Sequence, residues 1–131
     1  MNENKLREAF EERGFNTDDA SRLGAFWKWI GGAINIDEFD CNDGLCECYS
    51  YQHDCLVLTD DEADMLWDEY LDNHIEECID PELPDNLRFY FDTDAWKRDA
   101  RIDGRGHCLS GWDGGEDEID FLGVTYYIYK Q

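Results

Sequence analysis

The stretch between Lys28 and Arg88 runs for 59 residues without a lysine or arginine, yet it contains 18 aspartates and glutamates. Protein surfaces usually mix both signs, because like charges repel and destabilise the compact state. The excess is also uneven, since residues 1–32 carry six acids and five bases, whereas residues 33–131 carry 27 acids and six bases. Any fold of this chain must therefore expose an acidic surface that its own bases cannot balance.

The composition argues against a disordered acidic tail. The chain is 42% hydrophobic and 15% aromatic and has two prolines, which is enough apolar material for a core. We therefore expect one α+β domain over residues 1–131. At a net charge of −22, binding to nucleic acid or to an anionic membrane is not expected, because both need basic patches. The expected partner is a basic protein surface.

The N-terminal sequence lacks a positively charged segment followed by an apolar run, and no stretch is long enough to cross a bilayer. We therefore expect a cytoplasmic protein. In a reducing cytosol the six cysteines are expected to be mostly free thiols.

Residues 1–32 form a near-neutral segment that predicts two short helices. Gly14 is placed to end the first, Asn16 or Thr17 to cap the second, and Gly31-Gly32 to stop it. The acidic segment 33–80 begins with β-forming residues around Asn42-Asp43-Gly44, a tight-turn sequence. These residues predict a hairpin with arms of about residues 34–41 and 45–57.

A long amphipathic helix is predicted after the hairpin. Thr59 and Glu62 have the spacing of a capping box. The apolar residues at helical spacing are Ala63, Leu66, Trp67, Tyr70, Leu71 and Ile75. The opposite side carries the acidic ridge, defined as Asp61, Asp64, Asp68, Asp72 and Glu76. Neighbouring ridge carboxylates would lie about 4.5–6 Å apart along the axis, with no lysine in the helix to relieve their repulsion. A merely solvated face is the alternative.

Residues 81–131 predict short helices followed by antiparallel strands. Pro84 suits the first turn of a helix, and Asp92 or Thr93 can cap the next one. The bases here are Arg88, Lys97, Arg98, Arg101 and Arg105, and they are expected to pair with the interspersed Asp92, Asp94, Asp99 and Asp103. The sequences HCLSGW and VTYYIYK, separated by a DGGE turn, are expected to form the closing strands. In the second of them, Tyr126, Ile128 and Lys130 should lie on one side and Tyr127 and Tyr129 on the other.

The segment from Leu83 to Gly104 resembles the C-terminal motif of the ArdA-type antirestriction proteins. The matching positions are Leu83, Pro84, Leu87, Tyr90, Phe91, Asp92, Ala95, Trp96, Arg98 and Asp99. The match covers about a sixth of the chain. The resemblance implies an elongated acidic protein of a phage or mobile element, acting in the host cytoplasm. Such proteins imitate duplex DNA, occupy the DNA groove of type I restriction enzymes, and are often dimers.

The sequence also contains residues that could serve two other classes of function, zinc binding and catalysis. Cys41, Cys46, Cys48 and Cys55 offer enough soft ligands for zinc, but without the paired Cys-x2-Cys spacing of structural sites. An enzyme would need a set of groups such as a nucleophile motif around His53, His74 or His107, and none is present. We therefore expect no cofactor, no dedicated metal site and no catalysis. A regulatory module that binds a basic protein without imitating DNA stays open.

The sequence thus predicts a DNA mimic that inhibits a host defence nuclease. Type I restriction enzymes are the first target and a CRISPR complex, through its DNA channel or PAM pocket, is the alternative. The predicted contacts comprise the acidic ridge together with Asp37, Glu38, Asp40 and Asp43 on the hairpin and Glu116, Asp117 and Glu118 on the C-terminal turn. A homodimer, if formed, is expected to use Phe26, Trp27 and Trp29 or the strand 126–129.

Overall fold

The computed structural model describes residues 2–31, 35–42, 47–50 and 53–131. The α-helices are α1 (Glu3–Glu12), α2 (Thr17–Trp29), α3 (Asp60–His74), α4 (Thr93–Ala100) and α5 (Arg105–Leu109). The strands are β1 (Asp40–Asn42), β2 (Glu47–Ser50), β3 (His53–Thr59), β4 (Asp117–Phe121) and β5 (Val124–Lys130). The short helical turns are η1 (Ile36–Glu38), the π turn η2 (Ile75–Ile79), η3 (Asp80–Glu82), η4 (Arg88–Tyr90) and η5 (Arg101–Asp103). The α+β class is confirmed.

The five strands form one antiparallel sheet in the order β1-β2-β3-β5-β4. The C-terminal strand β5 therefore lies inside the sheet between β3 and β4, with Cys55 of β3 opposite Lys130 and Thr59 opposite Tyr126. Strands β1 and β4 are at the two edges; β4 has three acidic residues and β1 has one. Charged edge strands oppose pairing with a further strand.

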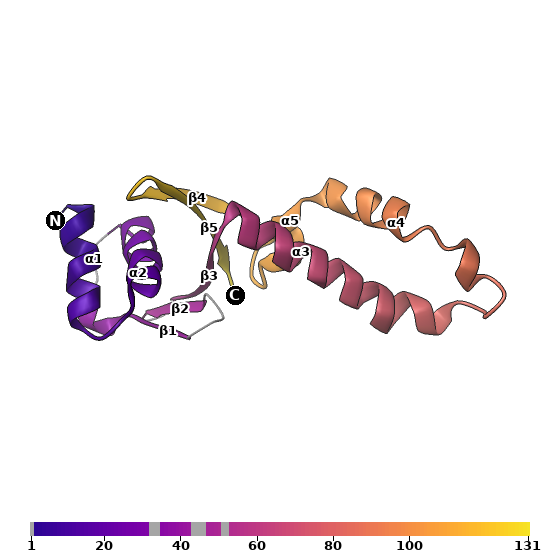
Figure 1. The fold of residues 1–131 in the computed structure, drawn as a ribbon, viewed down its shortest axis with the longest axis horizontal. Coiled ribbons are helices and arrows are strands. Elements are labelled where there is room, and N and C mark those ends of the chain that lie inside the picture. Colours follow the sequence, from indigo (N-terminus) through magenta and orange to yellow (C-terminus); the bar gives the residue numbers. More distant parts are fainter. Residues whose placement is uncertain (1, 32–34, 43–46, 51–52) are drawn as a thin grey trace.

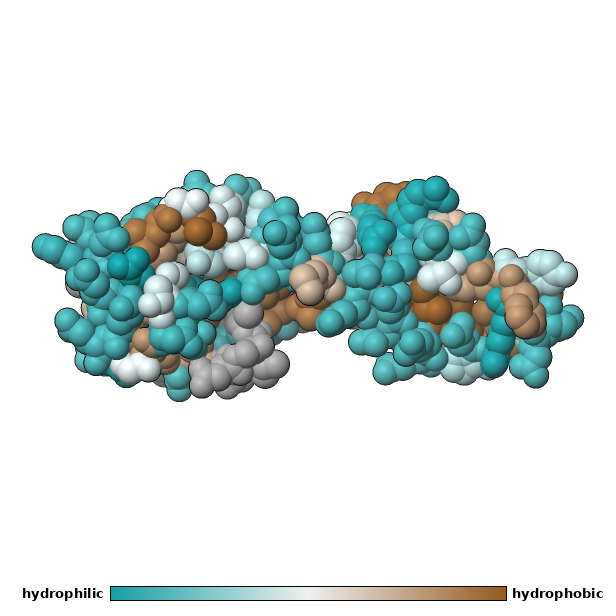
Figure 2. Space-filling view, viewed as in Figure 1, coloured by the Kyte–Doolittle hydropathy of each residue, from teal (hydrophilic) through white to brown (hydrophobic). Residues whose placement is uncertain are grey.

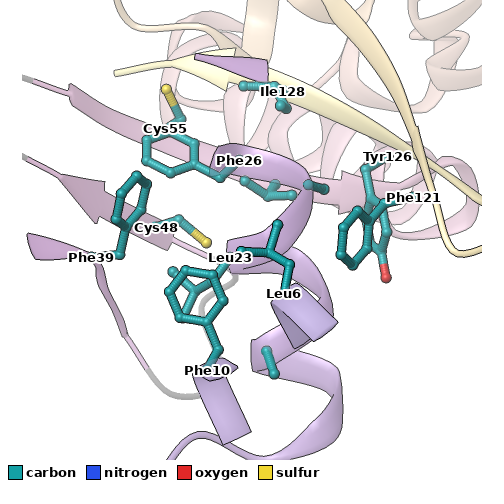
Figure 3. Packing of buried hydrophobic residues seen from close by; sticks show 13 residues of the cluster. Leu6, Phe10, Leu23, Phe26, Phe39, Cys48, Cys55, Phe121, Tyr126 and Ile128 are labelled. Carbon is teal, nitrogen blue, oxygen red and sulfur yellow. The ribbon is translucent and has the colours of Figure 1, made fainter. Parts of the chain in front are cut away.

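Helix α2 covers one face of this sheet, and α1 packs against α2 (Figure 1). Their core is rich in aromatic side chains, and the Phe26 and Phe39 rings meet edge to face at a centroid distance of 5.6 Å, beside Cys48 (Figure 3). Gly24 on α2 is needed here, because a Cβ at this position would lie 2.3 Å from the ring of Phe121. The helix boundaries agree with the sequence, since Asn16 caps α2 and Gly14 and Gly31 have positive φ.

The other face of the sheet is covered by the first turns of α3 and by α5. Leu58, Ala63, Leu109 and Tyr129 form this second cluster. Strand β5 thus buries side chains on both faces, with Ile128 in the first cluster and Tyr129 in the second. The predicted alternation along this strand is confirmed.

Helix α3 then leaves the sheet and projects into solvent. Its capping box is confirmed, because the Thr59 side chain accepts from the Glu62 amide and Glu62 accepts from the Thr59 amide. We call residues 60–104 the arm and the rest of the described chain the body. In Figure 1 the arm is a helical hairpin in which α3 runs outward and α4 returns beside it. The accessible surface of 8010 Å² exceeds the roughly 7,200 Å² expected for a compact chain of this mass.

Four details of the sequence interpretation were wrong. The second hairpin arm is two strands, β2 and β3, rather than one. The sequence around HCLSGW forms α5 instead of a strand, because Gly104, with a φ of 86°, turns the chain into a helix there. The segment after Pro84 makes only a 3-10 turn. Tyr70 of the apolar stripe is exposed.

Candidate functional site

The arm concentrates the charge of the protein. It holds 16 acids and four bases, a net charge of −12 within 45 residues. The 15 residues of α3 span about 22 Å, so this charge is spread along a rod that stands clear of the body (Figure 1). Most of its surface is hydrophilic (Figure 2). The arm is therefore the strongest candidate for binding a basic partner.

The acidic ridge is partly neutralised, which the sequence interpretation missed. Lys97 Nζ lies 2.5 Å from Asp68 Oδ1 and 2.8 Å from Asp72 Oδ1. Arg101 on the following turn also reaches Asp68, with an Nη2 to Oδ1 distance of 2.8 Å. These bases pair with α3 and not with the interspersed aspartates of their own segment. Because α4 returns beside α3, the repulsion within the ridge is relieved from a neighbouring element.

The ion pairs shift the pKa values of Asp68 and Lys97 in favour of their charged forms. Hydrogen bonds from Lys97 hold the pKa of the Asp68 carboxyl below its usual value, although partial burial opposes the shift. Hydrogen bonds to Asp68 and Asp72 raise the pKa of Lys97. Both groups are therefore charged at neutral pH, and their fields largely cancel at a distance.

Arg105 at the start of α5 neutralises carboxylates in the first turns of α3. Its guanidinium lies 2.8 Å from Asp60 and 2.8 Å from Asp64, and its Nε donates to Glu116. The guanidinium also stacks over the Tyr127 ring at 4.4 Å from the centroid. The Glu116 carboxylate accepts a further hydrogen bond from the Tyr129 hydroxyl. This network joins the C-terminal turn to α3, so Asp64 and Glu116 have a structural role.

Three of the carboxylates along α3 and the following turn η2 are unpaired in the segments that the structure describes. Asp61, Glu69 and Glu76 are exposed and have no ion pair among the described residues. At a helical rise of 1.5 Å they are spaced about 10–12 Å apart. One strand of duplex DNA carries a charge about every 3.4 Å. The charges of Asp61, Glu69 and Glu76 are therefore spaced more widely than those of a phosphate backbone. The other acids of the arm must contribute if it is to imitate one.

Further exposed carboxylates lie on the rest of the arm, in η2, η3, α4 and η5. Glu77, Glu82, Asp94, Asp99 and Asp103 are exposed and likewise lack an ion pair within the described part of the chain. Together with Asp61, Glu69 and Glu76 they make up the exposed, unpaired carboxylates of the arm, a set that we call the free acidic face: Asp61, Glu69, Glu76, Glu77, Glu82, Asp94, Asp99 and Asp103. Asp61 and Glu76 are the two ridge residues that it retains.

The hairpin acids lie apart from the arm. Asp37 pairs with Arg13 at 2.6 Å, whereas Glu38 and Asp40 are exposed, and Asp43 lies outside the described residues. Asp40 is on the edge strand β1, while the exposed Asp117 and Glu118 are on β4 at the opposite edge. The structure therefore does not bring the three predicted groups of contacts together on one surface.

Of the hairpin cysteines that the structure describes, Cys48 and Cys55 are buried in the core and Cys41 packs against it. Cys48 lies opposite both Cys41 and Cys55 in neighbouring strands, and Cys46 is outside the described residues. Burial raises the pKa of the Cys55 thiol to about 12, so this sulfur is a poor thiolate ligand. No group of three or more histidine, cysteine or acidic side chains suited to a metal ion is found in the parts that the structure describes.

The structure also shows the surroundings of His74 and of the residues expected at a dimer contact. His74 stacks on Trp96, with a centroid distance of 5.4 Å, and so fixes α3 against α4. The residues expected at a dimer contact are mostly unavailable, because Phe26, Tyr126 and Tyr129 are buried in the core.

The buried Arg22 was not anticipated from the sequence. Its side chain is only 6% exposed, and its guanidinium lies 2.7 Å from Glu62 and donates to the carbonyl of Val57. The capping glutamate of α3 is therefore also anchored to α2. A lone arginine in an amphipathic helix gives no signal of such a partner, since Glu62 is 40 residues away.

Comparison with protein-family models, with curated proteins and with solved structures found no match to this chain. Among the described residues, no helix has the length and apolar character needed to span a membrane.

Proposed function

We propose that this protein is a stoichiometric inhibitor that places its arm in the DNA channel of a host defence nuclease. The observation that carries the proposal is the arm itself, a projecting helical hairpin with a net charge of −12. Its free acidic face would occupy positions that phosphates take in the enzyme–DNA complex. Charge complementarity of this kind speeds association and makes binding fall steeply with salt.

A type I restriction enzyme is the first target, because the segment from Leu83 to Gly104 resembles the ArdA-type motif. That segment forms the free end and the returning helix of the arm. A CRISPR surveillance complex is the second target, since its DNA channel has the same basic chemistry. A module that only sequesters a basic protein would share the charge but would not compete with DNA for one groove.

Competition with duplex DNA tests the proposal. A labelled duplex containing the recognition site is bound to a purified type I methyltransferase complex, and the protein is added at 50 and 200 mM salt. We expect stoichiometric displacement of the duplex that weakens strongly at the higher salt. The same titration against a CRISPR complex decides between the two targets. Failure to displace DNA from either complex would refute the proposed function.

A pair of variants with equal charge changes locates the contact. Glu69→Gln with Glu76→Gln removes two charges from the free acidic face, and Glu8→Gln with Glu12→Gln removes two exposed charges from α1 in the body. We expect the arm variant to bind the target about tenfold more weakly and the body variant to change little. Equal losses for both would mean that only the net charge matters, as for a non-specific acidic module.

A further inference from the structure

The free end of the arm carries apolar side chains that the fold does not use. We call residues 76–94 the tip. Phe89 is 94% exposed and Tyr90 is 83% exposed, with half-exposed Leu87 beside them in the chain. In Figure 2 hydrophobic surface is visible among the hydrophilic surface of the arm. Adjacent aromatic side chains that are almost wholly solvated contribute little to folding, and exposed apolar surface of this kind is typical of interaction sites.

The tip is a built structure that holds these rings outward. The turns η3 and η4 follow each other around Pro81 and Pro84. Arg88 Nη2 donates to the carbonyl of Asp80 at 3.1 Å, which closes the loop across eight residues, and its Nη1 lies 3.6 Å from Asp85. The single base of the tip is thus used internally, while the neighbouring side chains Phe89 and Tyr90 stay in solvent.

The surroundings of the rings are acidic. The tip holds seven acids and one base, a net charge of −6 within 19 residues. A second copy docking tip to tip would bring two such segments together, and an anionic membrane would be repelled in the same way. Aromatic anchors within a charged rim are typical of protein interfaces, in which the anchor fills an apolar pocket and the rim meets opposite charge.

We propose that Phe89 and Tyr90 are anchor residues that enter an apolar pocket bordered by lysine and arginine on the target protein. This inference rests on the proposed function and adds a second kind of contact to it. The free acidic face governs the rate of association and its salt dependence, whereas the aromatic anchors govern the rate of dissociation. The arm would then be held in the channel by its tip, which a phosphate backbone cannot do.

The test measures binding rates on an immobilised type I methyltransferase complex, or on the CRISPR complex if the competition assay selects it. The tip variant is Phe89→Ser with Tyr90→Ser. Its matched control is Trp112→Ser, which removes an aromatic ring that is 77% exposed on the body. We expect the tip variant to dissociate at least tenfold faster, with its association rate and salt slope within twofold of the unmodified protein, and the control to be unchanged. Phe89→Leu with Tyr90→Phe should largely restore slow dissociation.

Each contrary result has a separate meaning. An unchanged dissociation rate of the tip variant, with DNA displacement intact, would overturn the anchor but leave the proposed function standing. If light scattering gave a dimer that the tip variant converts to monomer, while target binding was unaffected, the occupant would be a second copy. No binding of the unmodified protein to either complex would overturn both inferences. Melting temperatures within about 2 °C would confirm that the variants are folded.

Discussion

Arg105 pairs with three carboxylates at the junction of the arm and the body. Its side chain is only 12% exposed and is surrounded by Asp60, Asp64 and Glu116. In a chain with this excess of acid, a guanidinium shared by three carboxylates offsets their repulsion and satisfies several acceptors with one side chain. The attachment of the arm to the body therefore depends strongly on one residue.

Replacing Arg105 tests this dependence. We expect Arg105→Gln to lower the free energy of unfolding by about 2 kcal/mol, because three carboxylates then lie together without a cation. The value is below that for a fully buried pair, since Asp60 and Asp64 are largely exposed. The control is Arg98→Gln, an exposed arginine on α4, which should change stability by less than about 0.5 kcal/mol. Urea unfolding that gave equal stabilities for the two variants would contradict the role of Arg105.

Glu62 gives the chain a pH dependence of known sign. Burial favours its neutral form, but hydrogen bonds from Arg22 and from the Thr59 amide outweigh burial and lower the pKa of Glu62. A lowered pKa in the folded state stabilises the protein above the unfolded value of 4.5, and this contribution is lost as the pH falls through the folded value.

The corresponding variant is Glu62→Gln, which resembles protonated glutamate. We expect it to be about 1–2 kcal/mol less stable than the unmodified protein at pH 7, and nearly equal to it at pH 3. Urea unfolding at the two pH values measures both differences. The control Glu69→Gln, on the exposed side of α3, should show no loss at pH 7. A constant deficit at both pH values would mean that Glu62 acts through packing alone.

At the scale of the elements, the sequence was informative where a signal is local. The capping box at Thr59, the cap at Asn16 and the two faces of β5 follow from neighbouring residues, and all three are confirmed. The sequence interpretation was wrong where the partner is distant in the chain. The pairing of Lys97 with Asp68 and Asp72 depends on α4 folding back along α3, and periodicity within one helix contains no information about that arrangement.

The paired and the unpaired carboxylates along α3 and η2 should consequently respond in opposite ways to neutralisation. Asp64→Asn with Asp68→Asn and Asp72→Asn removes the carboxylate partners of Lys97 and Arg101 and one of the three partners of Arg105, so we expect a loss of about 1–3 kcal/mol of stability. Asp61→Asn with Glu69→Gln and Glu76→Gln removes only unpaired charges, and stability should stay level or rise because like charges are removed. Urea unfolding of the two triple variants at the same pH measures the contrast. The reverse order would show that the ion pairs do not hold the arm together.

At the scale of the whole molecule, the body and the arm are stabilised by different forces. The body has two apolar clusters on the two faces of its sheet. On the arm, α4 has no fully buried side chain and is held by its ion pairs and by the stacking of Trp96 on His74. Added salt should therefore act differently on the two parts, because it screens both the attraction within the arm and the repulsion throughout the molecule.

Hydrogen exchange measured by mass spectrometry at 0.05 and 1 M salt tests this difference. The Debye length falls to about 3 Å at 1 M, so the exposed pair of Arg101 with Asp68 is screened most, and the pair of Lys97, whose side chain is 11% exposed, is screened less. We expect the amides of α4 to exchange several-fold faster at 1 M salt. Those of β3 and β5 should exchange no faster, since their protection comes from apolar burial and benefits from weaker net repulsion. If the strands lost protection while α4 kept its own, the arm would be stabilised by packing, and its ion pairs would contribute little to the fold.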